Sequence, residues 1–260
     1  MTAPGLAVEP HLRAVREAGK KILVTYMTGG LVAEWVRYVE AMADAGADAV
    51  EIGIPFSDPV MDGPTIQQAS GAALARGATP ASILDDVAGA QVDVPLVAMT
   101  YYNLVARAGH LRFARQLAAS GVRGAIVADI PLEESTGWEA DAGDSGVETV
   151  LLAAPVSSDD RLVEICRRSH GFVYGVNVMG VTGERARLST SAEVLAKRLK
   201  AVTDLPVVMG FGVSTPEQAA TAAAHADGAV VASALMRMVL AGAGPAEVAD
   251  TVKAFRTALG

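Results

Sequence analysis

The apolar positions of this chain gather into short runs that recur along most of its length. Eight runs are apolar at successive rather than alternate positions and are rich in valine, isoleucine and alanine. They are Ile22–Met27, Ala49–Ile54, Leu96–Tyr101, Ala125–Val127, Thr149–Ala153, Phe172–Val176, Pro206–Gly210 and Ala229–Val231. Continuous apolar strands are typical of parallel sheets, which are buried on both faces. We therefore predict eight parallel strands.

Between these runs lie segments whose apolar residues recur at helical spacing. In Val32–Ala45, for example, Val32, Trp35 and Val39 share one stripe. Proline is the first residue of the final helical segment, where its missing N–H costs nothing. The other predicted helices are His11–Ala18, Leu111–Ser120, Asp159–Arg168, Ala192–Val202, Pro216–Ala224 and Pro245–Ala258.

The order of these elements predicts the fold class. Glycine at a helix end followed by an apolar strand, as in Ser120-Gly121-Val122, is the expected connection in an α/β protein. Eight strand–helix units within 260 residues fit a (β/α)8 TIM barrel. We expect one domain over residues 1–260, with an extra N-terminal helix. The alternative is an open doubly wound sheet, but no Gly-x-Gly-x-x-Gly follows the first strand.

The composition limits which partners the protein can bind and where in the cell it is expected. The chain is 51% hydrophobic and 19% charged, which argues against disorder, and its net charge of −8 argues against nucleic-acid binding. The single cysteine, Cys166, excludes a disulfide framework and is expected in the core. We see no signal peptide and no apolar run as long as a membrane span, so we expect a cytoplasmic protein.

Two carboxylates stand out at the second predicted strand and its following loop. Glu51 interrupts an apolar run. Burying a carboxylate costs free energy or shifts its pKa, so its presence in such a run needs an explanation. It is either an acid/base catalyst or a structural ion-pair partner. Asp62 follows in a loop bounded by proline and glycine, where turn formation is the simpler explanation. The whole segment reads Glu51-Ile52-Gly53-Ile54-Pro55-Phe56-Ser57-Asp58-Pro59-Val60-Met61-Asp62-Gly63-Pro64-Thr65-Ile66-Gln67.

Other polar residues follow the remaining strands, at the end where barrel enzymes place their active sites. Tyr174 lies among core residues and needs a partner for its hydroxyl, either in the core or on a ligand. Tyr101 is expected to form a wall of the same pocket. None of the lysines ends a strand, so a Schiff base has no evident nucleophile, and the histidines lie at helices, so a metal cluster is not expected.

Glycine-bearing loops after the last three strands predict a phosphate site. Gly183, Gly210 and Gly212 would let the backbone approach a ligand, and Ser233 would donate its hydroxyl and cap a short helix, Ala234–Val239. The simpler alternative is that these glycines only form tight turns. The loops concerned include Thr182, Phe211 and Ala232.

The segment from Glu51 to Gln67 closely resembles the signature of the tryptophan synthase α-subunit family. The resemblance extends from about Ile22 to the end of the chain and implies a (β/α)8 barrel. Two departures are a Thr28-Gly29-Gly30 loop where the family has Gly-Asp-Pro or similar, and Ala232 in place of a glycine. Further matches, in the family's order, are Tyr101-Tyr102-Asn103-Leu104-Val105, Val127-Ala128-Asp129-Ile130-Pro131, Gly180-Val181-Thr182-Gly183 and Gly210-Phe211-Gly212-Val213-Ser214.

The resemblance also implies an activity, cleavage of indole-3-glycerol phosphate to indole and D-glyceraldehyde 3-phosphate. It implies that Glu51 is the general acid/base, that Asp62 accepts from the indole N–H, and that Tyr174 lies beside the cleaved bond. The residues it implies for substrate and phosphate binding are Gly183, Gly212, Ala232, Ser233, Phe211, Tyr101 and Thr182.

The family resemblance further implies a partner, a β subunit that holds pyridoxal phosphate in an α2β2 complex, and no cofactor on this chain. The main alternative is a stand-alone lyase that releases free indole. Indole-glycerol-phosphate synthase would need strand lysines, and phosphoribosylanthranilate isomerase would need a cysteine near the first strand; neither is found. A non-enzymatic activator of a partner is disfavoured because both acids are present.

Overall fold

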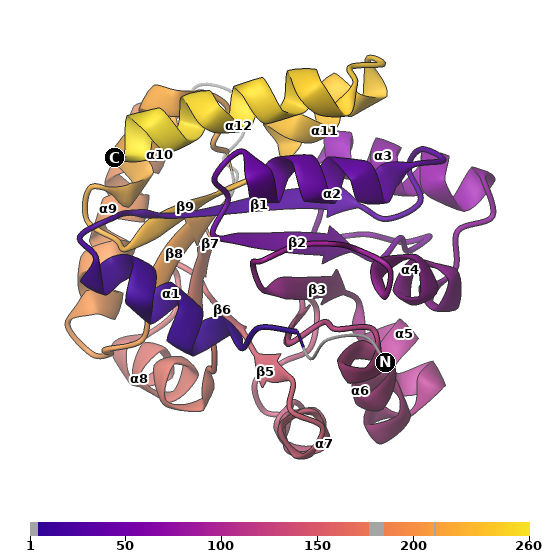
Figure 1. Cartoon of the computed structure of the whole chain (residues 1–260). Helices are drawn as coiled ribbons and strands as arrows, with labels where there is room; N and C mark the ends of the chain where they lie inside the picture. The colour runs from indigo at the N-terminus through magenta and orange to yellow at the C-terminus, as the bar shows by residue number, and fades with distance from the viewer. Residues whose placement is uncertain (1–4, 177–184, 211) are drawn as a thin grey trace.

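Nine strands form one parallel sheet that curls into a nearly closed barrel, and helices cover its outside (Figure 1). The computed structural model describes residues 5–176, 185–210 and 212–260, with the backbone alone for 185–190. Within that part of the chain the strands are β1 (Ile22–Thr28), β2 (Ala49–Gly53), β3 (Leu96–Thr100), β4 (Gly124–Val127), β5 (Glu148–Thr149), β6 (Leu151–Ala153), β7 (Val173–Val176), β8 (Val207–Gly210) and β9 (Gly228–Val231).

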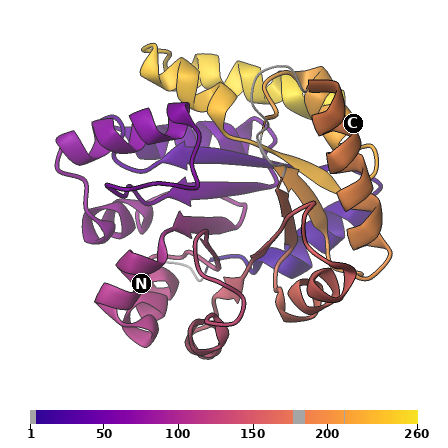
Figure 2. The same cartoon turned by 180° about the vertical axis from the view of Figure 1, so that it is seen from behind.

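The helices alternate with the strands and surround them when the molecule is seen from behind (Figure 2). None of the described helices is long and apolar enough to cross a membrane. They are α1 (Val8–Glu17), α2 (Trp35–Asp44), α3 (Pro64–Ala75), α4 (Pro80–Val87), α5 (Tyr102–Ala108), α6 (His110–Ala119), α7 (Thr136–Asp144), α8 (Asp159–Arg168), α9 (Arg185–Lys200), α10 (Pro216–Ala223), α11 (Ser233–Leu240) and α12 (Pro245–Leu259).

The barrel closes through a strand that changes its pairing partner. The sheet order is β5-β4-β3-β2-β1-β9-β8-β7-β6, so its two ends are consecutive pieces of chain separated only by Val150. The Val150 N–H donates to the Ala125 carbonyl at 2.9 Å, after which the chain pairs with β7 instead of β4. The predicted single strand Thr149–Ala153 is therefore the fifth barrel strand, divided into β5 and β6. The (β/α)8 prediction is confirmed.

The other predicted strands agree with the observed ones within one or two residues, because most of them are apolar runs buried from end to end. The N-terminal helix is confirmed as α1 and begins earlier than predicted. Helices α3, α4, α5 and α7 were not predicted. In α3 most apolar side chains are alanines, so its helical stripe is weak although Ile66, Ala69 and Ala73 are buried.

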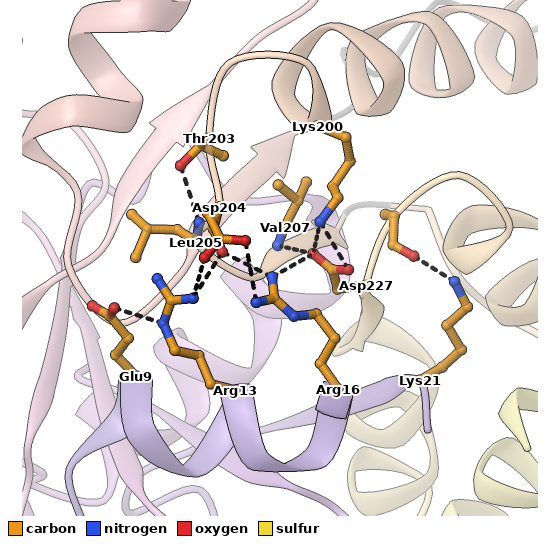
Figure 3. Close-up of polar contacts among 11 residues, drawn as sticks. Glu9, Arg13, Arg16, Lys21, Lys200, Thr203, Asp204, Leu205, Val207 and Asp227 are labelled. Atoms are coloured by element: carbon orange, nitrogen blue, oxygen red, sulfur yellow. Dashed lines mark hydrogen bonds and ion pairs between the residues drawn. The ribbon is translucent and has the colours of Figure 1, made fainter. Parts of the chain in front are cut away.

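Helix α1 lies across the end of the barrel where the strands begin, and a charged network ties it there (Figure 3). The carboxylate of Glu148, the first residue of β5, accepts from the backbone N–H groups of Val8 and Glu9. The guanidinium of Arg13 donates to Asp204 at 2.7 Å. Buried Asp227 accepts from the Lys200 ammonium at 2.8 Å and from the Val207 N–H at 2.8 Å.

The altered loop after β1 is shaped by its packing. The Gly29 N–H donates to the Gly53 carbonyl at 2.9 Å, and Gly30 has a φ of 74°. A Cβ at position 29 would lie 2.7 Å from the Ile83 side chain of α4, so the chain backbone itself contacts that helix. Glycine at these positions is therefore required by a close helix approach and by a left-handed turn.

Candidate active site

A cavity of about 220 Å³ opens at the carboxyl ends of the strands. Its walls come from the interior of the barrel and from the first turns of α3 and α11. Because β1 and β2 pair with Tyr26 opposite Glu51, these two side chains point to the same side of the sheet. The lining residues are Tyr26, Glu51, Asp62, Gly63, Pro64, Thr65, Ile66, Met99, Tyr174, Gly212, Val213, Ser214, Val230, Ala232, Ser233 and Arg237.

Glu51 lies in the wall of this cavity and is fully buried, with 0% of its surface exposed. Neither of its carboxylate oxygens has a hydrogen-bond partner among the described residues. Burial alone raises the pKa of Glu51 to about 8. The structural alternative, an ion pair with a basic group, is therefore not found among the described residues. A carboxyl that is protonated near neutral pH and faces a ligand-sized cavity is suited to acid/base chemistry.

Asp62 faces the same cavity from the loop between β2 and α3, and its backbone is held at both ends. Its N–H donates to the Pro59 carbonyl at 3.0 Å, and its carbonyl accepts from the Gln67 amide at 2.8 Å. The Tyr101 hydroxyl donates to its carboxylate at 3.0 Å. Burial raises the pKa of Asp62 to about 6, although the Tyr101 hydrogen bond lowers it. At neutral pH Asp62 is thus mainly a carboxylate.

Tyr101 stands behind Asp62 and is not itself among the lining residues. Its ring stacks on Phe56 with centroids 5.1 Å apart, and its hydroxyl also accepts from the Met61 N–H at 3.1 Å. Tyr101 was expected to form a wall of the pocket, but it instead supports Asp62 from behind. The phenol links the loop that carries Asp62 to the end of β3.

Tyr174 of β7 and Tyr26 of β1 both line the cavity, and each occupies a space left by a glycine. A Cβ at Gly210 would lie 2.3 Å from the Tyr174 hydroxyl oxygen, and one at Gly53 would lie 1.8 Å from that of Tyr26. Burial and the negative charges of Glu51 and Asp62 raise the pKa of Tyr174. Burial likewise raises the pKa of Tyr26, so both phenols stay neutral at neutral pH.

The structure describes only some of the residues that were predicted to bind phosphate. Gly212, Ala232 and Ser233 line the cavity, and Gly212 has a φ of 83°, which favours glycine. Gly183, Thr182 and Phe211 lie outside the described residues. The prediction that Ser233 caps the last short helix is wrong, because α11 starts at Ser233 itself and its N-cap is Ala232, without a side-chain cap. The first N–H groups of α11 are therefore left without a side-chain cap at the cavity.

The cavity residues to which sequence reasoning assigned no role include Tyr26 and Arg237. Tyr26 is a phenol within an apolar strand, which is the same signal that singled out Tyr174. Arg237 lies one turn into α11, where no motif points to it. Cys166 is buried, as expected, and burial raises the pKa of its thiol to about 11. The described residues hold no group of three or more potential metal-binding side chains.

Comparison with known proteins agrees with this geometry. A family described as "Tryptophan synthase alpha chain" matches residues 12–259. The chain is 41% identical to the tryptophan synthase alpha chain of Geobacter sulfurreducens, over 95% of this chain and 96% of that one. It is 41% identical to that of Streptomyces avermitilis, over 91% and 87% of the two chains. It is 49% identical to that of Gluconacetobacter diazotrophicus over a shorter stretch, 76% and 73%.

Solved structures agree over nearly the full length. A chain of Mycobacterium tuberculosis tryptophan synthase has a TM-score of 0.89 at 36% identity and covers 98% of both chains. Tryptophan synthase subunit alpha from Legionella pneumophila has a TM-score of 0.86 at 29% identity and covers 97% of both. Sequence, barrel and cavity lead to one conclusion: the chain belongs to the tryptophan synthase alpha chain family.

Proposed function

We propose that Glu51 and Asp62 perform the α reaction in this chain. As a member of the tryptophan synthase alpha chain family, the protein is a carbon–carbon lyase of tryptophan biosynthesis that acts on indole-3-glycerol phosphate. The products are indole and D-glyceraldehyde 3-phosphate. The observation that supports the assignment of residues is the pair itself: two carboxyls face one cavity, and burial raises their pKa values to about 8 and about 6.

Glu51 is proposed as the general acid and base. With a pKa of about 8 it holds a proton at neutral pH and delivers it to C3 of the indole ring. The resulting carboxylate then takes the proton from the hydroxyl on the adjacent carbon of the glycerol chain. That carbon becomes the aldehyde carbon as the bond to C3 breaks, and the bond's electron pair returns to the ring. One carboxyl thus ends each cycle in the protonation state in which it began.

Asp62 is proposed as the anion that accepts from the indole N–H. Protonation at C3 places positive charge on the ring nitrogen, and a nearby carboxylate stabilises that charge. A pKa of about 6 keeps Asp62 ionised at neutral pH while Glu51 remains protonated. The Tyr101 hydroxyl, 3.0 Å from the carboxylate, orients it. Two acids in different environments thereby take two roles.

The other residues are proposed to bind and position the substrate. Tyr174 lies beside Glu51 and would hold the glycerol chain at the cleaved bond. Backbone N–H groups of Gly212 and Ala232, with the Ser233 hydroxyl, would receive the phosphate at the start of α11. Gly183, Thr182 and Phe211 remain proposals drawn from the family resemblance.

We propose that the α reaction on this chain requires no bound cofactor. The indole ring protonated at C3 accepts the electron pair of the breaking bond, so neither a Schiff base nor pyridoxal phosphate has a step to perform here. In the tryptophan synthase α2β2 assembly implied by the family, pyridoxal phosphate belongs to the β subunit. The carboxyls and phenols of the cavity are sufficient for the proton transfers described.

A β subunit is the proposed partner. The relatives named above are alpha chains, and the Mycobacterium tuberculosis structure is of tryptophan synthase. In addition, two apolar side chains next to Asp62 are exposed to solvent, Val60 at 77% and Met61 at 46%. A partner that covers this loop would bury them and would also contact the segment that positions Asp62. The comparisons offer no support for a stand-alone lyase.

We also propose that residues 1–260 act as one domain. The first and last strands, β1 and β9, pair along four residues, and the C-terminal helix α12 packs against α2 and β1. In Figure 1 α12 lies alongside α2. These contacts join the two ends of the chain and support a single unit.

The proposed function is tested by incubating the full chain with indole-3-glycerol phosphate and measuring both products, with and without a tryptophan synthase β subunit. We expect indole and glyceraldehyde 3-phosphate in equal amounts, and faster cleavage when β is present. Full activity without β and no response to it would favour the stand-alone lyase. The absence of cleavage under both conditions would overturn the proposal.

A further inference from the structure

We infer that Arg237 binds the anionic phosphate of the substrate and thereby sets the enzyme's preference for phosphorylated over neutral indole-glycerol. The inference rests on the proposed function and adds a side-chain cation to a site otherwise proposed from backbone groups and one hydroxyl. It starts from the charged residues of the cavity. Among the described lining residues these are Glu51, Asp62 and Arg237.

The location of Arg237 in its helix directs it toward the phosphate end. It lies four residues after Ser233 in α11, so the two side chains share one face of the helix, one turn apart. Helical side chains lean toward the N-terminus and cover the turn that precedes their own Cα. The guanidinium therefore extends over the start of α11, where Ala232 and Ser233 line the cavity.

Arg237 is the one arginine among the described lining residues of the cavity, and it has no protein partner there. Across the described residues no hydrogen bond or ion pair engages its guanidinium, and the residue is exposed. By contrast, the partly buried Arg168 and Arg256 are engaged by carboxylates, Arg168 by Glu139 at 2.7 Å and Arg256 by Asp48 at 2.8 Å. An unpaired guanidinium at the edge of a cavity is free to form a bidentate contact with a phosphate.

The positive charge of Arg237 offsets the negative charge that surrounds the cavity. The chain has a net charge of −8, and its cavity contains two carboxyls. At neutral pH the ionised Asp62 and the net negative charge of the chain repel a doubly charged substrate unless positive charge lies near the entrance. Arg237 supplies it at the end away from the proposed reacting atoms, and so it also favours the orientation in which the indole ring enters toward Asp62.

The test compares Arg237→Gln and Arg237→Lys with Arg115→Gln in the full chain. Arg115 is an exposed arginine of α6 that does not line the cavity. For Arg237→Gln we expect a rise in KM for indole-3-glycerol phosphate of about three- to tenfold with little change in kcat, since uniform binding is lost. The lysine variant should restore part of this loss, and the control should match the wild type.

Three further readouts make the inference specific for phosphate. Arg237→Gln should weaken competitive inhibition by inorganic phosphate, flatten the fall of kcat/KM with added salt, and leave cleavage of unphosphorylated indole-3-glycerol unchanged. An unchanged KM for the phosphorylated substrate, or an equal loss with the neutral one, would overturn the inference while the lyase activity itself stands. A wild type without lyase activity would instead overturn the proposed function.

Discussion

The hydroxyl of Tyr101 donates a hydrogen bond to the carboxylate of Asp62 across 3.0 Å. The two residues come from different strand–helix connections, so this bond joins the loop after β2 to the end of β3. Because it favours the ionised form, it lowers the pKa of Asp62 against the opposing effect of burial. The charge on which the proposed chemistry depends is thus maintained by a residue outside the cavity wall.

Replacing Tyr101 by phenylalanine keeps the ring against Phe56 and removes the hydrogen bond. We expect the pKa of Asp62 to rise above about 6, so that the acidic limb of the kcat/KM profile moves to higher pH. Activity at pH 7 should fall about three- to tenfold. A pH–rate profile checks this. Tyr102→Phe is the matched control, because that hydroxyl contacts His110 instead. An unmoved acidic limb in Tyr101→Phe would contradict the account.

Glu51 should make the fold less stable as the pH rises. Its pKa is near 4.5 in an unfolded chain and about 8 in the folded protein, so the folded state binds the proton more tightly. The stabilisation of the folded state by the proton on Glu51 is complete below the pKa of Glu51 in the unfolded chain, and it is lost as the pH rises to about 8. Between pH 5 and pH 8 the wild type should lose about 3 kcal/mol more unfolding free energy than Glu51→Gln. Urea unfolding at several pH values measures this; parallel curves for the two proteins would refute it.

Gly210 is expected to matter because of Tyr174. A methyl group at position 210 would meet the phenol oxygen at 2.3 Å and force the ring away from its place beside Glu51. Gly210→Ala should therefore reduce kcat more than Tyr174→Phe, which removes only the hydroxyl and should cost about tenfold or less. Steady-state kinetics of the two variants give the comparison. Gly71→Ala, with no atom within 4 Å of the added Cβ, is the control and should remain fully active.

The charged network at the opposite end of the barrel should affect stability without affecting catalysis. Asp227 is 8% exposed and accepts from Lys200 and from the Val207 N–H. Asp227→Asn should lower the unfolding free energy by about 1–3 kcal/mol, since a partly buried pair loses one charge. Asp204→Asn removes a carboxylate whose side chain is 84% exposed, and it should lower the unfolding free energy less than Asp227→Asn does. Equal losses in thermal unfolding would contradict this difference.

The sequence predicted the barrel well because its strands are continuous apolar runs, a signal that depends on local residues alone. The break at Val150 was not predictable in this way, since the change of partner from β4 to β7 arises from barrel closure. Helix α3 was missed because its alanines make a weak stripe. The expected cap at Ser233 followed a local preference for serine, whereas the helix starts at that residue and leaves its first N–H groups toward the cavity.

For the site, burial and spacing identified Glu51 as a candidate, and the roles of the two acids came from the family resemblance. Tyr101 was placed in the wall, but its position behind Asp62 depends on how two loops fold together. Arg237 gave no sequence signal, because an arginine in an amphipathic helix is ordinary on a protein surface. The proposed role of Arg237 is apparent only from its place in the cavity that α11 borders.

The most direct test is the rate of indole release by Glu51→Gln, measured with the β subunit present and with folding verified by circular dichroism. Glutamine preserves the shape of the side chain but neither delivers nor accepts the required proton. We expect release to fall by at least about 100-fold, in keeping with the contribution of a general acid/base, while the substrate still binds. Near-wild-type release by this variant would contradict the central claim that Glu51 transfers the proton.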